Sequence, residues 1–197
     1  MTTLSVPRQT TALLMMDFQA GILQGHAPDR DTLVPRAGTL LAAARSAGLP
    51  VIHVVVGFRP GHPEVSARNP SFSAIAQAGR FATGDALAEI VPELAPRADE
   101  AVVTKHRVGA FTSTDLDMLL RAHGVNTLVL AGVATSGVVL STLRVAADTD
   151  FHIVVARDAC SDADAQVHEV LMDKVFPRQA TVIDTRSIID AMAVAAP

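Results

Sequence analysis

The sequence predicts an α/β fold: a three-layer, doubly wound and mostly parallel sheet of six strands with helices on both faces. Two observations support this prediction. Short apolar, β-branched runs recur along the chain, and stretches with helical spacing separate them. Buried parallel strands look like this because helices cover both faces of their sheet, so polar and apolar residues do not alternate. Alternating elements of this kind build one domain, which we expect to span residues 1–197.

The apolar runs place the strands at Ala12–Met16, Val51–Val56, Ala101–Thr104, Thr127–Leu130, His152–Val155 and Thr181–Ile183. Between them, helical spacing predicts helices at Leu33–Ala47, from Asp115 to near Gly124, and at Val139–Ala147, Ala163–Val175 and Ser187–Val194. Gly48 and Gly124 end the first two of these helices. We expect Thr114 or Ser113 to cap the second, since a hydroxyl can accept a hydrogen bond from a free N–H of the first turn.

Residues 57–83 interrupt this alternation. The segment contains Pro60, Pro63 and Pro70, and it directly follows the second predicted strand. Long loops without secondary structure are uncommon in compact domains and are usually functional or disordered. Ligands of open α/β sheets collect beyond the carboxyl ends of the strands. We therefore expect a loop that forms a lid or pocket wall, the alternative being a solvated excursion or a subunit contact.

Composition excludes several classes of function. Sixteen Lys and Arg against 20 Asp and Glu give a net charge of −4, whereas nucleic-acid and anionic-membrane surfaces need clustered positive charge. The one cysteine, Cys160, cannot form an intrachain disulfide and fits a reducing compartment. No apolar run approaches the ~18–20 residues of a membrane span, and the first residues lack the apolar segment of a secretory signal. We expect a cytoplasmic protein with a small-molecule partner.

Chemistry-bearing residues follow three of the predicted strands. Asp17 comes directly after the first strand, Lys105 after the third, and residues 132–137 form a glycine-bracketed turn after the fourth. The carboxyl ends of parallel strands meet at one edge of the sheet, so an acid, a cation and a helix N-terminus should lie together. An acid beside a lysine keeps its charge in a partly dry pocket, and amides at a helix N-terminus stabilise developing negative charge.

The spaced motifs LLMMDFQ, KHRVGAF with TDLDMLL, LVLAGVATSGVVLSTL, and ARDAC followed by His168 resemble the isochorismatase-like (cysteine hydrolase) superfamily over residues 10–190. The resemblance implies a doubly wound α/β fold, a homo-oligomer and an Asp-Lys-Cys triad, whose Asp and Lys would be Asp17 and Lys105. It also implies a non-proline cis peptide bond between Val133 and Ala134, with the backbone amides of Ala134 and residue 138 directed at an oxyanion.

The nucleophile of the cysteine hydrolases falls on Val138, which carries no reactive atom. Cys160 lies at a different family position, where we expect it to pack as a small hydrophobe. The hydroxyls of Thr135, Ser136 and Ser141 flank position 138, but a hydroxyl nucleophile needs an oriented base. We expect Thr135 to support the turn and Ser136 to cap the helix.

Two interpretations remain. The first is a family hydrolase that cleaves a vinyl ether or a C–N (amide-type) bond of a small molecule with Asp17 and Lys105 alone. The resemblance extends to isochorismatases, which also lack this cysteine and use the aspartate as an acid. The alternative is a catalytically inactive member that binds a small molecule or serves as an oligomeric structural protein. A third class, acyl transfer by Ser136 or Ser141, is the weakest.

Cofactors and metals are not expected. No Walker sequence is present, no G-x-G-x-x-G opens a helix after a strand, and the region after the second strand lacks the Asp-x-His pair that metal-binding relatives carry there. His53, inside the second strand, is predicted to be a hydrogen-bonded core residue. In the pocket we expect His62 and Arg59, whose guanidinium can bind a substrate carboxylate. Four aromatic residues are expected either to line the cleft or to pack in the core, namely Phe18, Phe58, Phe72 and Phe111. We assign no chemistry to His106, His123 or His168.

Overall fold

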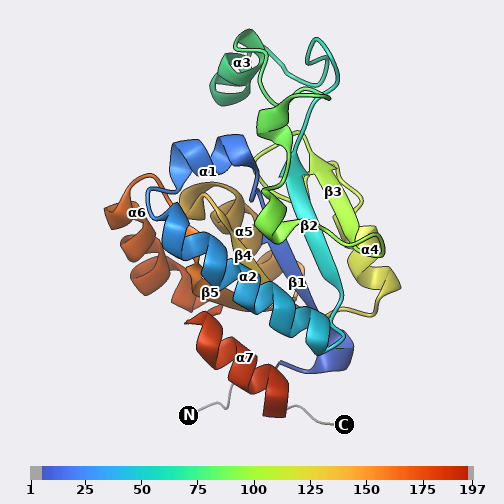
Figure 1. Cartoon of the computed structure of the whole chain (residues 1–197), viewed down its shortest axis with the longest axis vertical. Helices are drawn as coiled ribbons and strands as arrows, with labels where there is room; N and C mark the ends of the chain where they lie inside the picture. The colour runs from blue at the N-terminus through green and yellow to red at the C-terminus, as the bar shows by residue number, and fades with distance from the viewer. Residues whose placement is uncertain (1–5, 195–197) are drawn as a thin grey trace.

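Six parallel strands form one sheet in the order β3-β2-β1-β4-β5-β6 (Figure 1). The computed structural model describes residues 6–194. The strands are β1 (Thr11–Met16), β2 (Val51–Val56), β3 (Ala101–Lys105), β4 (Thr127–Val133), β5 (His152–Ser161) and β6 (Thr181–Ile183). Every neighbouring pair is parallel, so the predicted fold class is confirmed. The winding direction reverses between β1 and β4, which is where open α/β sheets bind ligands.

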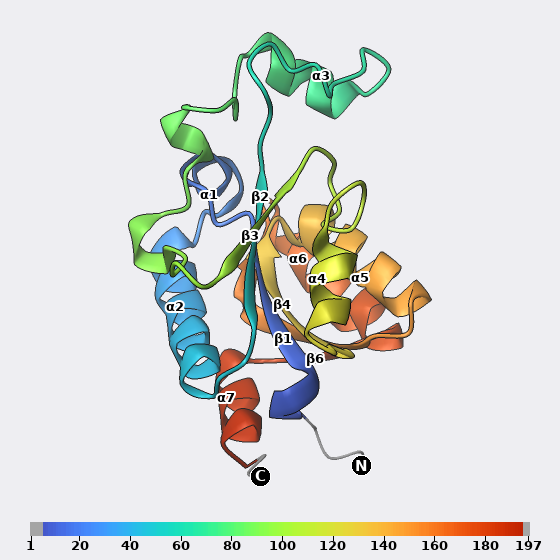
Figure 2. The same cartoon turned by 90° about the vertical axis from the view of Figure 1, so that its right-hand side faces the viewer.

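Helices cover both faces of the sheet (Figure 2). The α-helices are α1 (Ala20–His26), α2 (Arg30–Ser46), α3 (Pro70–Gln77), α4 (Leu116–Ala122), α5 (Leu140–Asp148), α6 (Ala165–Val170) and α7 (Thr185–Val194). Helices α1, α2 and α7 bury their apolar residues in the core cluster on one face, together with Leu13 and Met15 of β1. Helices α4 and α5 pack on the other face, against Leu14 and Met16. Successive residues of β1 thus point to opposite cores, as a strand buried on both faces requires.

The predicted strands β2 and β6 match the structure, whereas β4 and β5 extend past their predicted carboxyl ends. Strand β5 continues to Ser161 through polar residues, and a register shift against β4 lies between Leu130 and Gly132. Asp115 occupies the N-cap position of α4, but its side chain makes no capping hydrogen bond. The predicted Thr114 hydroxyl accepts the N–H of Leu116, the first residue of the helix, at 3.4 Å and donates to the carbonyl of Ala110 at 2.6 Å.

The segment 57–83 is not a structureless loop, because it contains α3 and projects from the body of the sheet (Figure 1). The Asn69 side chain accepts the N–H of Phe72 at 3.2 Å, and Pro70 occupies the first helical turn, so both helix-start signals are present. The rings of Phe58, Phe72 and Phe81 form a small apolar cluster with Val56 at the base of the projection. The segment therefore has a core of its own, which the sequence analysis did not predict.

Among residues 6–194, no helix has both the length and the hydropathy that a membrane crossing requires.

Candidate active site

Asp17 and Lys105 form a buried ion pair at the carboxyl edge of the sheet. Asp17 directly follows β1, and Lys105 is the last residue of β3, so the two side chains meet across the end of β2. The Lys105 Nζ lies 2.9 Å from the Asp17 Oδ2, and the two side chains are only 3% and 7% exposed. The sequence prediction that these two residues come together is thus seen directly in the geometry.

The backbone of Asp17 has an uncommon conformation. Its φ angle is +58°, in the left-handed region that residues other than glycine seldom adopt. Its N–H donates to the carbonyl of Val54 at 2.8 Å, which continues the β1–β2 pairing by one residue while the chain turns away. Strained backbone of this kind clusters at functional sites, because packing must hold it in place.

The two charged groups leave one acceptor free. Lys105 donates a second hydrogen bond, to the carbonyl of Arg107 at 3.2 Å, whereas the Asp17 Oδ1 is buried and has no hydrogen-bond partner among residues 6–194. Burial raises the pKa of Asp17, and the nearby Lys105 ammonium opposes this rise without cancelling it. The result is a buried carboxyl group with increased proton affinity and one oxygen that no described group engages.

The turn after β4 lies beside this pair. Met16 pairs with Gly132, so the chain leaves β1 at Asp17 and β4 at Val133 on adjacent strands. A cis peptide bond joins Val133 to Ala134, as the family resemblance implies. The carbonyl of Ala134 accepts the N–H groups of Gly137 and Val139, whereas the N–H of Ala134 donates to no acceptor in the described part of the chain.

Val138 lies inside this turn and is 2% exposed, packed in the same apolar core as Val139 and Leu143. The predicted capping role of Ser136 was wrong: the helical turn 135–139 begins after Ala134, and no side chain caps it. Instead, the backbone N–H of Ser136 donates to the Asp162 Oδ2 at 2.7 Å. The predicted supporting role of Thr135 agrees with its contacts, since its buried hydroxyl bonds to the Nδ1 of His168 at 2.8 Å.

Sequence reasoning missed two residues near the site. His168 received no role, and its position on α6, opposite Thr135, depends on how β5 and α6 pack, so no local motif reveals it. Gln19 is fully buried, and its amide bonds both the N–H and the C=O of Val56, each at 2.8 Å, and the C=O of Ala88 at 2.6 Å. Gln19 thereby fixes the end of β2 beside Asp17. A glutamine three residues after a buried strand was the available signal.

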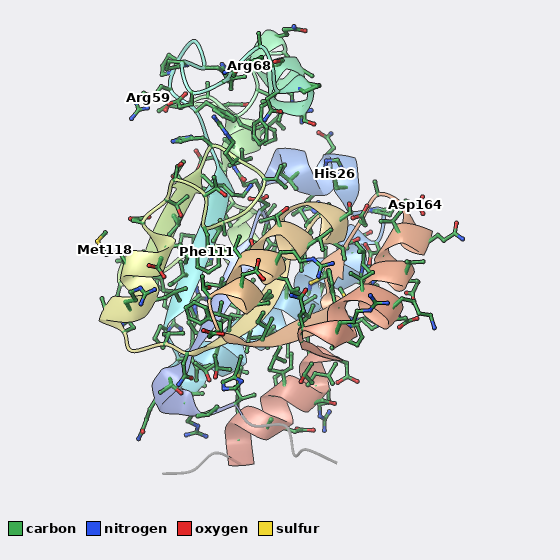
Figure 3. All side chains as sticks on the ribbon, turned by 180° about the vertical axis from the view of Figure 1, so that it is seen from behind. His26, Arg59, Arg68, Phe111, Met118 and Asp164 are labelled. Carbon is green, nitrogen blue, oxygen red and sulfur yellow. The ribbon has the colours of Figure 1, made fainter. Side chains whose placement is uncertain are left out.

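The predicted pocket residues have other contacts. His62 is buried, stacks on Phe58 with the ring centroids 5.1 Å apart, and contacts the carbonyl of Arg80 at 2.7 Å through Nε2, so it supports the projecting segment. Arg59 is exposed on that segment (Figure 3) and pairs with Glu64 at 2.6 Å. It also borders a cavity of about 420 Å³ at the base of the segment, together with Thr104 and His106.

Of the aromatic candidates outside the projecting segment, Phe18 is buried and Phe111 is partly buried against a core cluster. Phe18 belongs to the core on the α1–α2 face, and the ring of Phe111 lies 6.1 Å from that of Phe151, the residue before β5. These contacts agree with core packing for Phe18, whereas Phe111 keeps part of its surface exposed.

His53 and Cys160 are both held in the interior. His53 is buried and bonded to Glu100 at 3.1 Å, as predicted for a core histidine. Cys160 is also buried, and burial raises the pKa of its thiol to about 12. Across residues 6–194 no three His, Cys, Asp or Glu side chains cluster as metal ligands would.

Comparisons with known proteins agree with this architecture. The Isochorismatase domain family matches residues 11–187. The chain is 34% identical to the uncharacterized isochorismatase family protein YecD of Escherichia coli O157:H7, over 96% of this chain and 100% of that protein. It is 31% identical to the maleamate amidohydrolase of Pseudomonas putida, over 87% and 82%. An isochorismatase family protein from Burkholderia thailandensis superimposes with a TM-score of 0.84 at 29% identity, covering 96% of this chain and 98% of that structure.

Proposed function

The chain belongs to the isochorismatase domain family, and on this premise we propose that it hydrolyses a C–N bond of a small amide-type substrate with Asp17 and Lys105, without a thiol nucleophile. One observation carries the proposal: the Asp17 carboxylate is anchored to Lys105 through Oδ2, while the buried Oδ1 has no partner within residues 6–194. A buried acceptor without a partner costs free energy, so its retention is best explained by a proton that it takes up or delivers during the reaction.

In the proposed reaction a water molecule takes the place of the missing thiol. The Asp17 Oδ1 accepts a proton from the water as the water oxygen bonds to the substrate carbonyl carbon. The N–H of Ala134, which no acceptor of the described chain engages, donates to the resulting oxyanion. Asp17 then delivers the proton to the substrate nitrogen, the C–N bond breaks, and a carboxylic acid and an amine leave. The raised pKa of Asp17 makes it a stronger base than an ordinary aspartate.

One comparison favours a C–N bond over a vinyl ether, since the relative from Pseudomonas putida is a maleamate amidohydrolase. The substrate is therefore proposed to be a small amide, carbamoyl or ureido compound.

A substrate panel tests the proposal. Short amides, carbamoyl and ureido compounds and a vinyl ether are incubated with the wild type and with Asp17→Asn. We expect C–N turnover by the wild type and a loss of about 10²-fold or more in kcat for the variant, the range ascribed to a general acid–base group. Circular dichroism and thermal unfolding verify that the variant is folded. Equal turnover by both proteins, or turnover of the vinyl ether alone, would refute the proposal.

The apolar side chain at position 138 favours one alternative function. In this alternative the chain is a non-catalytic family member that binds a small molecule or acts as an oligomeric structural protein. Its buried isopropyl group gives the site an apolar floor where the family resemblance places sulfur. In that case the wild type hydrolyses none of the panel substrates, even when the enzyme is in excess over the substrate. Calorimetry should then detect binding of the same small molecule to the wild type and to Asp17→Asn.

A further inference from the structure

Two side chains from other parts of the chain, those of His168 and Asp162, bind the turn that follows β4. The hydroxyl of Thr135 lies 2.8 Å from the Nδ1 of His168 on α6, and the N–H of Ser136 donates to the Asp162 Oδ2 at 2.7 Å. These contacts fall on the two residues directly after Ala134, whose N–H is the proposed oxyanion donor. The position of that N–H therefore depends on α6 and on the residue that follows β5.

The direction of the Thr135–His168 hydrogen bond follows from burial. Thr135 is fully buried, and within residues 6–194 its hydroxyl contacts no other hydrogen-bonding group than His168. A buried hydroxyl needs an acceptor for its proton, so the Nδ1 of a neutral imidazole accepts it and the Nε2 carries the ring proton. A protonated imidazole has no lone pair to offer, and it would leave the Thr135 proton without an acceptor.

We infer that His168 is a positioning residue, whose neutral imidazole holds Thr135 and thereby keeps the Ala134 N–H in place for the hydrolysis proposed above. The inference rests on that proposed function. Protonation of His168 loosens the turn, so turnover declines on the acid side. Burial lowers the pKa of His168, which keeps the imidazole neutral over most of the physiological range.

Several charged groups surround the imidazole. Glu169, Asp29 and Asp162 favour its protonation, and Arg157 opposes it. Arg157 in turn pairs with Glu169 and, at 2.6 Å, with Asp173. These carboxylates could also titrate near the turn. A pH-dependent change there is therefore assigned to His168 only if replacing His168 removes it.

The experiment measures kcat and KM from pH 5 to pH 8 for the wild type, His168→Asn, His168→Leu and the control His123→Asn. His123 is exposed at the end of α4. In His168→Asn the new amide oxygen accepts the Thr135 hydroxyl without titrating, so we expect near-wild-type kcat at pH 8 and a flattened acid limb. Leucine accepts nothing, and we expect kcat to fall about tenfold or more with KM unchanged. The control should follow the wild type at every pH.

NMR tests the inference without using activity. In the wild type the imidazole of His168 should be the Nε2–H tautomer, and the amide signals of residues 134–139 should shift with the same midpoint as His168. In His168→Asn this transition should disappear, and in His123→Asn it should persist. An Nδ1–H tautomer, a transition that survives His168→Asn, or an acid limb shared by all variants would overturn the inference. If no panel substrate is turned over, the proposed function fails, but the NMR result still decides the role of His168.

Discussion

Asp17 and Lys105 are in contact at 2.9 Å although they end strands that are not neighbours in the sheet. Lys105 reaches Asp17 across the end of β2, whose backbone is held there by Gln19. The pair thus connects β1 and β3 by charge where no backbone ladder joins them. Both ions are removed from water, so each depends on the other for its solvation.

Replacing Lys105 with Met should destabilise the protein strongly at neutral pH. The variant leaves a buried carboxylate without its counter-ion, and breaking such a pair costs about 3–5 kcal/mol. The loss should shrink at acid pH, because protonation of Asp17 removes the uncompensated charge. Urea unfolding at pH 5 and pH 8 measures both effects. The double variant Asp17→Asn/Lys105→Met should regain most of the loss, whereas additive losses would mean that the two residues are not coupled.

Cys160 should be inert in the folded protein. Its thiol is buried, and burial raises its pKa to about 12, so the reactive thiolate is scarce at pH 8. Mass spectrometry after iodoacetamide treatment should show no modification in buffer and complete modification in urea. Cys160→Ala should retain wild-type turnover. Rapid alkylation of the native protein with loss of turnover would instead place the thiol in the reaction.

A thiol at position 138 should behave differently. Val138→Cys, made in the Cys160→Ala background, places sulfur where the family resemblance locates the nucleophile. We expect iodoacetamide to modify it and mass spectrometry to trap an acyl-enzyme with an activated ester. Val139→Cys is the matched control, buried in the same apolar core. If both introduced thiols are equally unreactive, position 138 does not face the reacting groups.

Glu100 should make stability depend on pH below neutrality. Arg45 binds its carboxylate through two hydrogen bonds of 2.7 Å and, with the N–H of Arg97 and the ring of His53, lowers its pKa from 4.5 to about 2. Because the folded-state pKa is depressed, this stabilisation is present above pH 4.5 and is lost as the pH falls toward 2. Glu100→Gln should cost about 3 kcal/mol at pH 6 and progressively less at pH 4 and pH 3, as measured by urea unfolding. A cost independent of pH would contradict this assignment.

Gly132→Ala should disturb the site through the ends of β1 and β4, the strands that position it. An added Cβ would lie 2.8 Å from the Met16 carbonyl oxygen, closer than real contacts allow, so the ends of β1 and β4 must separate. We expect a loss of about 1–3 kcal/mol in thermal unfolding and a lower kcat, because Asp17 follows Met16. Gly25→Ala on α1 is the control, since nothing lies within 4 Å of its Cβ and helix propensity predicts a small gain. Equal stabilities for the two variants would show that the β1–β4 contact is loose.

The sequence was sufficient for the fold class and for the pairing of Asp17 with Lys105, because apolar strands and strand-end residues are local signals with a known spatial consequence. It was insufficient for His168 and Gln19, whose contacts join segments far apart in the chain. The contacts of His62 could not be predicted for the same reason, since its burial depends on how the projecting segment folds back on Phe58. The local sequence predicts where a residue lies along a strand, but it does not predict how distant segments pack against one another.

The projecting segment begins and ends at one place. The N–H of Phe58 bonds to the carbonyl of Phe81 at 2.9 Å, and the N–H of Thr83 bonds to the carbonyl of Phe58 at 3.0 Å. The two ends of the segment are therefore hydrogen-bonded to each other beside the end of β2. A change of length within residues 59–80 leaves this junction in place, although it alters contacts with the rest of the chain such as the hydrogen bond from Arg107 to the carbonyl of Glu64.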